Sequence, residues 1–451
     1  MKKPLYTSKH PPGPKRLNPF SNLLGFRKDS LGFMKNIAEK YGDIAQFKIG
    51  HLRILLLNHP DFIKEVLSTQ QDNFVKGRPL KMAKELLGEG LLTSEGDFHK
   101  HHSRIMQPAF HRKMMDIYSP VMSEFASRLM NGWKNGTSVD IFKEMVRMST
   151  GIAGKTMFGV DLEEEAAEIN QEFESIMDIF GRVTLPFAEY LLKLPLPGSI
   201  RFFKAKSRLD KIIYKIIEER RKTKLDKGDL LSLLLLAQET NKKDRGISNE
   251  EIRDEALTLL LTAFDTTSLA LTWTWYLLSQ NPLAEEELHE EVDQVLQGRQ
   301  PTLDDYPKLK FTKMVFTEAM RLYPPIYVIV REARSNLTIG DYFIPKGTIV
   351  LMSPYLIHHD SRFHKDPMKF NPQSWAPSTN RQKSKYEYFP FSEGPRSCIG
   401  QHYAWLEGVM VIASISQFWR LKLVPDQVVE MAQLLNLRPK NGILMQLEKR
   451  K

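Results

Sequence analysis

The sequence has only one cysteine, Cys398, among its 451 residues. A single cysteine cannot form an internal disulfide, and it cannot supply the paired thiolates of a Cys-x-x-Cys zinc site. A lone cysteine is usually a small, buried apolar residue. The absence of other cysteines therefore leaves two readings of Cys398, a core residue or a single metal-binding sulfur, and its neighbours must decide between them.

The start of the chain lacks the apolar run that a signal peptide or membrane anchor requires. Residues 1–17 are basic and rich in proline, and no hydrophobic stretch follows them. The 64 Lys and Arg residues exceed the 54 Asp and Glu residues and give a formal net charge of +10. These charges are scattered and not interleaved with aromatic residues, which argues against a nucleic-acid partner. We therefore expect a cytoplasmic, monomeric protein without a stable membrane anchor.

The order of predicted elements indicates an α+β chain that is predominantly helical, with a minor β part. Strands are expected near Ile44–Ile49 and Arg53–Leu57, with a turn at Gly50-His51 between them. Residues 74–95 have the pattern of a loop with a short helix, and residues 99–240 that of successive helices broken at 194–198. A polar linker at 242–246, helices within 282–323, and strands from Ile326 and at 419–448 complete the pattern.

One long helix is predicted over Ile247–Leu278. Ser248 and Glu251 form a capping box at its start. Asp265 is the one charged residue between Ala256 and Leu278, so the stretch is long enough and apolar enough to span a bilayer. Its many threonines and its central carboxylate favour instead a helix buried in the core.

Asp265 and Thr266 are the notable residues of this helix. In the structural interpretation, the threonines bond back to helix carbonyls and Asp265 is an internally paired charge. In the functional interpretation, a buried acid beside a hydroxyl relays protons to a reacting oxygen. The sequence alone leaves both interpretations open.

The stretch around Cys398 resembles a ligand loop. It reads Phe-Ser-Glu-Gly-Pro-Arg-Ser-Cys-Ile-Gly over residues 391–400, with Arg396 two positions before the sulfur. Apolar residues at helical spacing follow Gly400, so the sulfur is expected just before a helix N-terminus, where a thiolate is favoured. A thiolate in such a loop suits a soft metal, of which haem iron is one candidate.

The spacing Phe-x-x-Gly-x-Arg-x-Cys-x-Gly is similar to the haem-binding signature of the cytochrome P-450 monooxygenases. The resemblance extends over essentially the whole chain and implies a single domain, 1–451, of a soluble bacterial type, with the long helix at its centre. It implies haem b with Cys398 as the metal ligand. Phe391 and Gly400, at the two ends of the loop, are further cofactor-binding residues that it implies. It also implies a propionate contact from Arg396. Arg331 resembles the other propionate-contacting arginine of the family, and a solvated arginine at a strand edge is the competing interpretation.

Further motifs agree with the resemblance. Thr262-Ala263 before Asp265-Thr266 is similar to the oxygen-activation segment of the family, although the family usually has glycine where this chain has Ala263. The resemblance implies that Asp265 and Thr266 deliver protons. Glu318-x-x-Arg321 looks like the helix motif of the family.

Two departures stand out. Ser374 occupies the place where the family has the arginine that completes the pair of Glu318 and Arg321. His99 and Ser103 stand where the family has a tryptophan and an arginine that contact a haem propionate, and His99, His102 or Arg104 could replace them. The cluster of His99, His101 and His102 could alternatively hold a metal, but adjacent residues of a helix point apart.

The resemblance implies a monooxygenase that inserts one atom of dioxygen into a lipophilic molecule; a haem-thiolate sensor without turnover is the alternative. No flavin or nicotinamide segment is visible, so electrons must come from separate proteins. The basic charge balance suits an acidic ferredoxin or flavodoxin and its reductase, docking on the cysteine side. Two stretches, 107–111 and 265–267, look more like those of fatty-acid-hydroxylating members than of terpene-specific ones. We therefore expect a fatty acid or another long apolar substrate, with residues 74–95 and 176–203 shaping its pocket.

Overall fold

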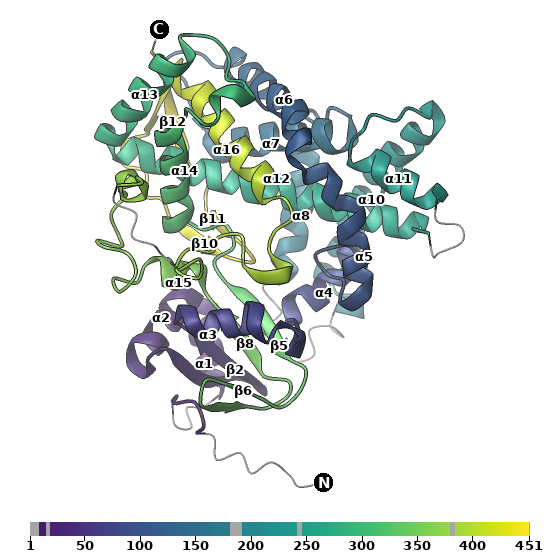
Figure 1. The fold of residues 1–451 in the computed structure, drawn as a ribbon, viewed down its shortest axis with the longest axis vertical. Coiled ribbons are helices and arrows are strands. Elements are labelled where there is room, and N and C mark those ends of the chain that lie inside the picture. Colours follow the sequence, from purple (N-terminus) through teal and green to yellow (C-terminus); the bar gives the residue numbers. More distant parts are fainter. Residues whose placement is uncertain (1–8, 15–18, 181–191, 241–245, 379–383, 451) are drawn as a thin grey trace.

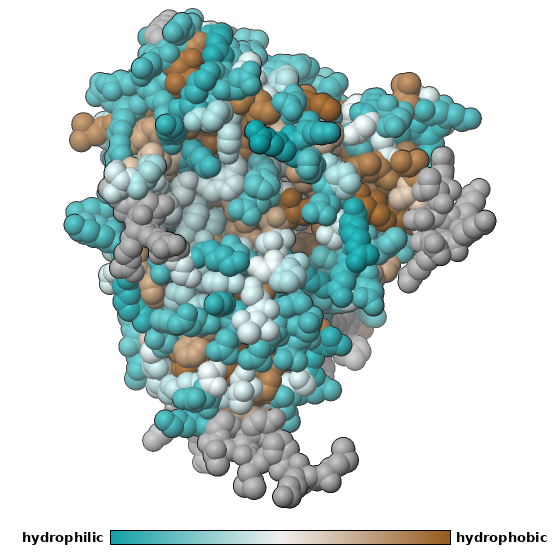
Figure 2. Space-filling view, in the orientation of Figure 1, coloured by the Kyte–Doolittle hydropathy of each residue, from teal (hydrophilic) through white to brown (hydrophobic). Residues whose placement is uncertain are grey.

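The computed structural model describes residues 9–14, 19–180, 192–240, 246–378 and 384–450. Helices dominate one end of the molecule, and a twisted sheet with short flanking helices forms the other (Figure 1). The expected α+β architecture with a minor β part is confirmed. The described surface in Figure 2 is mostly hydrophilic, with apolar side chains gathered on the side of helices α10 (Pro197–Thr223) and α11 (Leu230–Thr240).

The main sheet joins segments that are distant in the sequence. Its strands lie in the order β1 (Ile44–Ile49), β2 (Leu52–Leu57), β8 (Ile349–Met352), β5 (Ile329–Ala333) and β3 (Phe74–Lys76). Strands β2 and β8 are parallel, with Leu55 opposite Val350, and the other pairs are antiparallel. The β1–β2 hairpin agrees with the prediction because Gly50, at φ +57, turns the chain where the two apolar runs meet.

Helix α12 (Asn249–Gln280) lies at the centre of the helical part (Figure 1). The capping box of Ser248 and Glu251 is present at its start. Helices α7 (Ile141–Phe158), α10, α14 (Lys310–Leu322) and α16 (Gln401–Ser416) pack against α12. Among the described residues, α12 is the one helix long and apolar enough to cross a membrane, but most of that apolar window is buried inside the protein. Its position supports the interpretation as a core helix.

The other described elements surround this core. The remaining helices are α1 (Pro19–Lys28), α2 (Ser30–Tyr41), α3 (Pro60–Lys64), α4 (Arg78–Leu87), α5 (Gly96–Met106), α6 (Arg112–Asn131), α8 (Ala166–Phe180), α13 (Pro282–Leu296) and α15 (Pro354–His358). The smaller sheets are β4 (Ser138–Asp140) with β12 (Leu444–Lys449) and β9 (Trp419–Leu423), β10 (Met431–Gln433) with β11 (Leu437–Pro439), and β6 (Leu337–Ile339) with β7 (Tyr342–Ile344).

Two short strands were not predicted from the sequence. Strand β3 lies within 74–95, where the pattern predicted a loop with a short helix, and β4 lies within the stretch predicted as successive helices. Each has three residues and pairs with a strand from the C-terminal half, β3 with β5 and β4 with β12. Such strands form through tertiary pairing, which local sequence patterns do not record. The linker 242–245 and most of 1–17 lie outside the described residues.

Candidate active site

The loop that carries Cys398 folds as a tight turn directly before α16. The Cys398 N–H donates to the Phe391 carbonyl at 3.0 Å, and α16 begins at Gln401 with Gly400 as its cap. Gly394 has φ +79, and a Cβ there would lie 2.0 Å from the Leu67 carbonyl oxygen, so a larger residue does not fit. Gly400, in contrast, has an ordinary φ of −87. The sulfur therefore lies just before a helix N-terminus, as predicted, and Gly394 rather than Gly400 is the glycine that the backbone requires.

The thiol of Cys398 lies inside the protein but is not covered. Burial raises the pKa of the Cys398 thiol, and the Gly400 N–H opposes this shift only in part. The residue nevertheless has an exposed surface. Protein therefore surrounds the sulfur closely enough to disfavour its charged form, while part of the residue stays accessible. An apolar core residue would be covered by its neighbours, so the core interpretation of Cys398 is not supported.

A group of three cations lies beside this loop. Arg396 donates to the Glu95 carboxylate at 2.6 Å and to the Ser94 carbonyl at 3.2 Å. The backbone N–H of Lys76 donates to the same carboxylate at 2.6 Å, and its ammonium donates to the carbonyls of residues 91 and 92. Strand register places Lys76 directly opposite Arg331. Three cations, Lys76, Arg331 and Arg396, thus surround one carboxylate.

This arrangement is electrostatically unbalanced. Burial, reinforced by Arg396 and Arg331, lowers the pKa of Lys76 to about 7. Burial also lowers the pKa of Arg331 and of Arg396, and Glu95 opposes both shifts. Like charges directly opposite each other destabilise a strand pair, so the group has the charge of a site for an anionic ligand. Sequence analysis found Arg331 and Arg396 through the resemblance but missed Lys76, because only the β3–β5 pairing brings Lys76 into the group.

The histidines of α5 are separated by the helix. His99 is half-buried one turn after Glu95. His102 is buried, stacks on Phe98 with ring centroids 4.1 Å apart, and shares a 2.8 Å hydrogen bond with the Glu255 carboxylate of α12. Within the described ranges, no group of three His, Cys, Asp or Glu residues could hold a metal ion. The structure brings Arg331 and Arg396 together but provides no contact that joins His99 to them among the described residues.

Helix α12 presents one incompletely covered face. From Ile252 to Trp275 every residue is buried except Thr262, Ala263 and Thr266. These three positions are three or four residues apart or adjacent, so they share one side of the helix. The Thr266 hydroxyl donates to the Thr262 carbonyl at 2.9 Å, as the structural interpretation of the threonines expected. A face of small side chains left uncovered in an otherwise buried helix fits a bound cofactor or substrate.

Asp265 points away from this face. Its carboxylate accepts hydrogen bonds from Arg438, at 2.8 Å, and from the Asn436 amide, both in or beside β11. Burial raises the pKa of Asp265, while Arg438 and Asn436 oppose the shift. Asp265 is therefore an internally paired charge in this conformation, and the structure does not bring its carboxylate to the Thr266 hydroxyl.

The Glu318–Arg321 pair is buried and fully bonded without help from Ser374. Arg321 donates twice to Glu318, at 2.8 Å each, and also to the carbonyls of residues 358, 367 and 369. The Asn371 N–H and the Trp375 indole N–H donate to the Glu318 carboxylate at 3.0 and 2.8 Å. Trp375, one residue after Ser374, thus supplies the third arm of the network that an arginine supplies in the resembling family.

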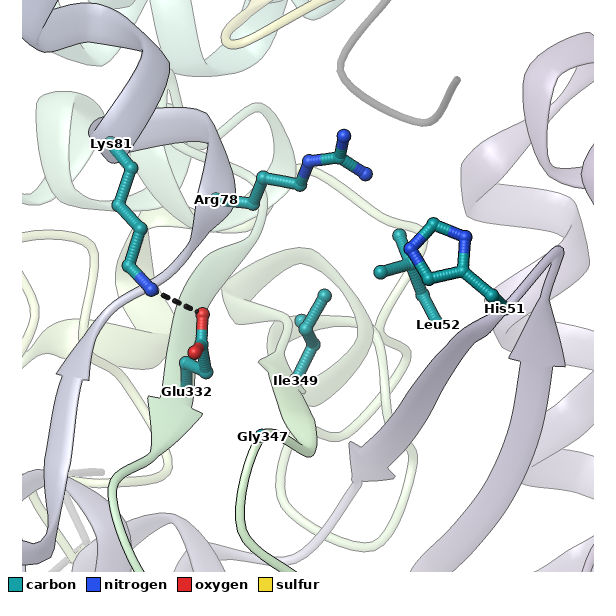
Figure 3. Close-up of a pocket in the computed structure, with 7 residues that line it drawn as sticks. All are labelled: His51, Leu52, Arg78, Lys81, Glu332, Gly347 and Ile349. Carbon is teal, nitrogen blue, oxygen red and sulfur yellow. Dashed lines mark hydrogen bonds and ion pairs between the residues drawn. The ribbon is translucent and has the colours of Figure 1, made fainter. Parts of the chain in front are cut away.

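A separate hollow of about 250 Å³ is lined by residues of the inner strands β2, β8 and β5 of the main sheet and by Arg78 and Lys81 of α4 (Figure 3). In Figure 3 the Arg78 side chain extends over it from α4, and Lys81 is paired with Glu332 of β5 at 2.6 Å. Glu332 and Arg331 are adjacent in one strand, so their side chains leave opposite faces of the sheet. This hollow therefore lies across the sheet from the cation group.

A single cysteine directly before a helix, a cation group beside its loop and an uncovered face on the central helix are the features that a haem-thiolate protein requires. Comparison with known sequences agrees: the sequence model of the family described as Cytochrome P450 matches residues 11–447. The chain belongs to the cytochrome P450 family and is a haem-thiolate monooxygenase that acts on a lipophilic substrate, with haem b, dioxygen and redox partners.

Named relatives cover most of the chain. Cyclooctatin synthase from Streptomyces melanosporofaciens is 34% identical over 387 residues, 85% of this chain and 84% of the relative. Pentalenene oxygenase from Streptomyces avermitilis is 30% identical over 399 residues, 88% of each chain. The human ultra-long-chain fatty acid omega-hydroxylase is 29% identical over 428 residues, 88% of this chain and 80% of the relative. These names favour turnover over the alternative of a sensor.

Proposed function

We propose that Cys398 is the thiolate ligand of haem b and that Lys76, Arg331 and Arg396 bind its propionates. The observation that carries this proposal is the charge of the cation group. Three basic side chains share the single carboxylate of Glu95, so two positive charges are uncompensated when all three are protonated, and haem b carries two propionates. An anion bound there would offset the repulsion between Lys76 and Arg331.

We also propose that His99 contacts a propionate. Its half-buried position one turn after Glu95 leaves it near the end of the cation group. Phe391 and Gly400 are proposed as walls of the cofactor site, because Phe391 anchors the Cys398 N–H and a Cβ on Gly400 would lie 3.9 Å from the Cys398 sulfur. Ala263 is proposed to face the cofactor from α12.

We further propose that Thr266 and Asp265 deliver protons to the reaction. When bound, haem b supplies the iron at which dioxygen is activated. The hydroxyl of Thr266 lies on the uncovered face of α12, and when it rotates away from the Thr262 carbonyl it can donate a proton beside that face. Asp265 is the adjacent acid, and its raised pKa suits a group that must hold and release a proton.

The test of the proton role is Thr266→Ala. We expect an unchanged haem spectrum and nearly unchanged consumption of reduced cofactor, with more hydrogen peroxide and less hydroxylated product. A positioned proton donor contributes roughly 10²-fold or more, so product per electron should fall strongly. Thr267→Ala is the matched control, because Thr267 is buried on another side of the same helix. Unchanged product per electron in Thr266→Ala would remove Thr266 from the mechanism and direct attention to Thr262.

For the substrate, we propose a lipophilic molecule with a ring skeleton rather than the fatty acid that the motifs suggested. The support is the names of the Streptomyces relatives, cyclooctatin synthase, cyclooctat-9-en-7-ol 5-monooxygenase and pentalenene oxygenase, at 34, 33 and 30% identity. A spectral titration of the haem with cyclic terpenes and with fatty acids of matched carbon number tests this. Tighter binding of the fatty acids would support instead the fatty-acid substrate that the sequence motifs favoured. The human relative is named as a fatty acid hydroxylase.

We also propose that an acidic ferredoxin or flavodoxin docks on the Cys398 side, in the cytoplasm. A Cβ on Gly400 would lie 3.6 Å from the Phe110 ring, so the start of α6 lies beside the cysteine loop. Arg112 and Lys113, the first residues of α6, are exposed there. Replacing both residues by Glu should slow the reduction of this protein by such a partner. The rate of that reduction should also depend less on ionic strength. Unchanged rates at low salt would place the docking surface elsewhere.

A further inference from the structure

The carboxylate of Asp265 is held by a short chain of side chains that the motif of the family does not contain. Arg438 donates from Nη2 to Asp265 at 2.8 Å and from Nε to the Asn436 amide oxygen at 3.0 Å. Asn436 in turn donates its amide N–H to the other oxygen of Asp265. The three side chains are almost completely buried. Asp265 is therefore tied to the β10–β11 hairpin and away from the uncovered face of α12.

Arg438 also reaches a second carboxylate. Its Nη1 lies 3.6 Å from Glu174 of α8, whose side chain is 48% exposed, whereas the side chains of Arg438 and Asp265 are only 7% and 6% exposed. The guanidinium lies 5.8 Å from the Phe142 ring of α7. The charged groups that act on Asp265 are thus Arg438 from β11 and Glu174 from α8. One cation stands between an interior carboxylate and a surface carboxylate.

We propose that Arg438 is a positioning residue for proton delivery, shared between Asp265 and Glu174, and that its position decides whether Asp265 is held as a carboxylate or is released to take up a proton. The inference rests on the proton role of Asp265 proposed above. It adds three residues, Arg438, Asn436 and Glu174, that connect this acid to the protein surface.

The physical reason is the cost of an unpaired buried charge. While Arg438 is paired with Asp265, its positive charge compensates the negative charge of the buried carboxylate. When the guanidinium moves toward Glu174, the buried carboxylate loses its cation, and its charged form is disfavoured. Asp265 then takes a proton from hydronium in the solvent on the Glu174 side: one O–H bond forms at the carboxylate, one breaks in the hydronium, and neutral water remains. A neutral Asp265 is no longer held by charge to β11 and can donate toward Thr266.

The protonation of Asp265 can be measured directly in the haem-loaded protein. The infrared carbonyl band of a buried carboxylic acid is followed as a function of pH, and Asp265→Asn identifies the band by removing it. In Arg438→Gln we expect the midpoint of the band to rise by about one pH unit or more, a tenfold gain in proton affinity. In Glu174→Gln we expect it to fall, because Arg438 then has only Asp265 as a carboxylate partner.

Controls separate positioning from stability. Arg438→Lys retains the cation and should keep the midpoint close to that of the unchanged protein. Arg420→Gln removes a cation from the nearby C-terminal strand β9, where Arg420 pairs with Glu285 at 3.0 Å, and should leave the midpoint unchanged. If Arg438→Gln does not fold, the downward shift in Glu174→Gln, a half-exposed site, still tests the proposal.

The outcomes distinguish this inference from the proposed function. A midpoint that moves in neither Arg438→Gln nor Glu174→Gln overturns the positioning role, even if Asp265→Asn loses product per electron. Normal product per electron in Asp265→Asn overturns the proton role of Asp265 itself. Opposite shifts in the two variants, accompanied by matching shifts in the pH profile of product per electron, are the expected result.

Discussion

Replacing Trp375 by Phe isolates the bond that closes the buried Glu318–Arg321 network. The change keeps an aromatic ring beside Tyr388, whose ring centroid lies 4.6 Å from that of Trp375, and beside His364. It removes the 2.8 Å bond from the indole N–H to the Glu318 carboxylate. That carboxylate then keeps Arg321 and the Asn371 N–H as donors.

The expected magnitude follows from the charge and burial of Glu318. The residue is 1% exposed, so water cannot replace the lost donor. A hydrogen bond to a charged group contributes about 1.5–3 kcal/mol, and we expect Trp375→Phe to lower the free energy of unfolding by about that amount. Arg321→Ala should lower the free energy of unfolding further, by about 3–5 kcal/mol. This variant leaves Glu318 without its cation and removes the donor from three backbone carbonyls.

The assay is denaturant unfolding of the haem-loaded protein, followed by the haem spectrum and by circular dichroism. A double-mutant cycle with Glu318→Gln separates the interaction free energy between Trp375 and Glu318 from the effect of changed ring packing. Ser374→Arg is the informative comparison: Glu318 already has its donors, so restoring the arginine of the family at this position should not stabilise the protein. A loss below about 0.5 kcal/mol in Trp375→Phe, the range of ordinary surface substitutions, would refute the assignment of Trp375 as the third arm.

Two further predictions concern the cofactor site. Cys398→Ser should abolish the thiolate spectrum of the reduced, carbon-monoxide-bound protein, because no other cysteine exists to replace the sulfur; survival of that spectrum would contradict the ligand assignment. In haem-free protein, Lys76 has a pKa lowered from 10.5 to about 7, so its charge destabilises the fold fully below pH 7 and this penalty disappears as the pH rises toward 10.5. Lys76→Met should remove that rise of stability with pH, and bound haem should also reduce it. If the free energy of unfolding depends on pH in the same way for the haem-free variant and the haem-free unchanged protein, the charge of Lys76 does not destabilise the fold.

Much of the architecture was determined by local patterns in the sequence. The capping box at Ser248, the turn at Gly50 and the long apolar run of α12 are signals carried by neighbouring residues, and each appears where it was predicted. Gly394 is similar, since its positive φ is a requirement of the turn itself. The position of Cys398 just before α16 also follows from the sequence, because the spacing from sulfur to helix is local.

The electrostatic environment of the site was decided only by the tertiary structure. Lys76 joins the cation group because β3 pairs with β5, and Arg438 reaches Asp265, 173 residues earlier in the sequence, because the β10–β11 hairpin packs on α12. Trp375 replaces the absent arginine because the chain turns its indole N–H toward Glu318, although the sequence had drawn attention to its neighbour Ser374. Patterns along the chain record which residues can form a helix or a turn, whereas the partner of a buried charge depends on which distant segments meet around it. That is why the sequence identified the position of Cys398 before a helix and the central helix itself, and only the fold showed which residues balance the buried charges around them.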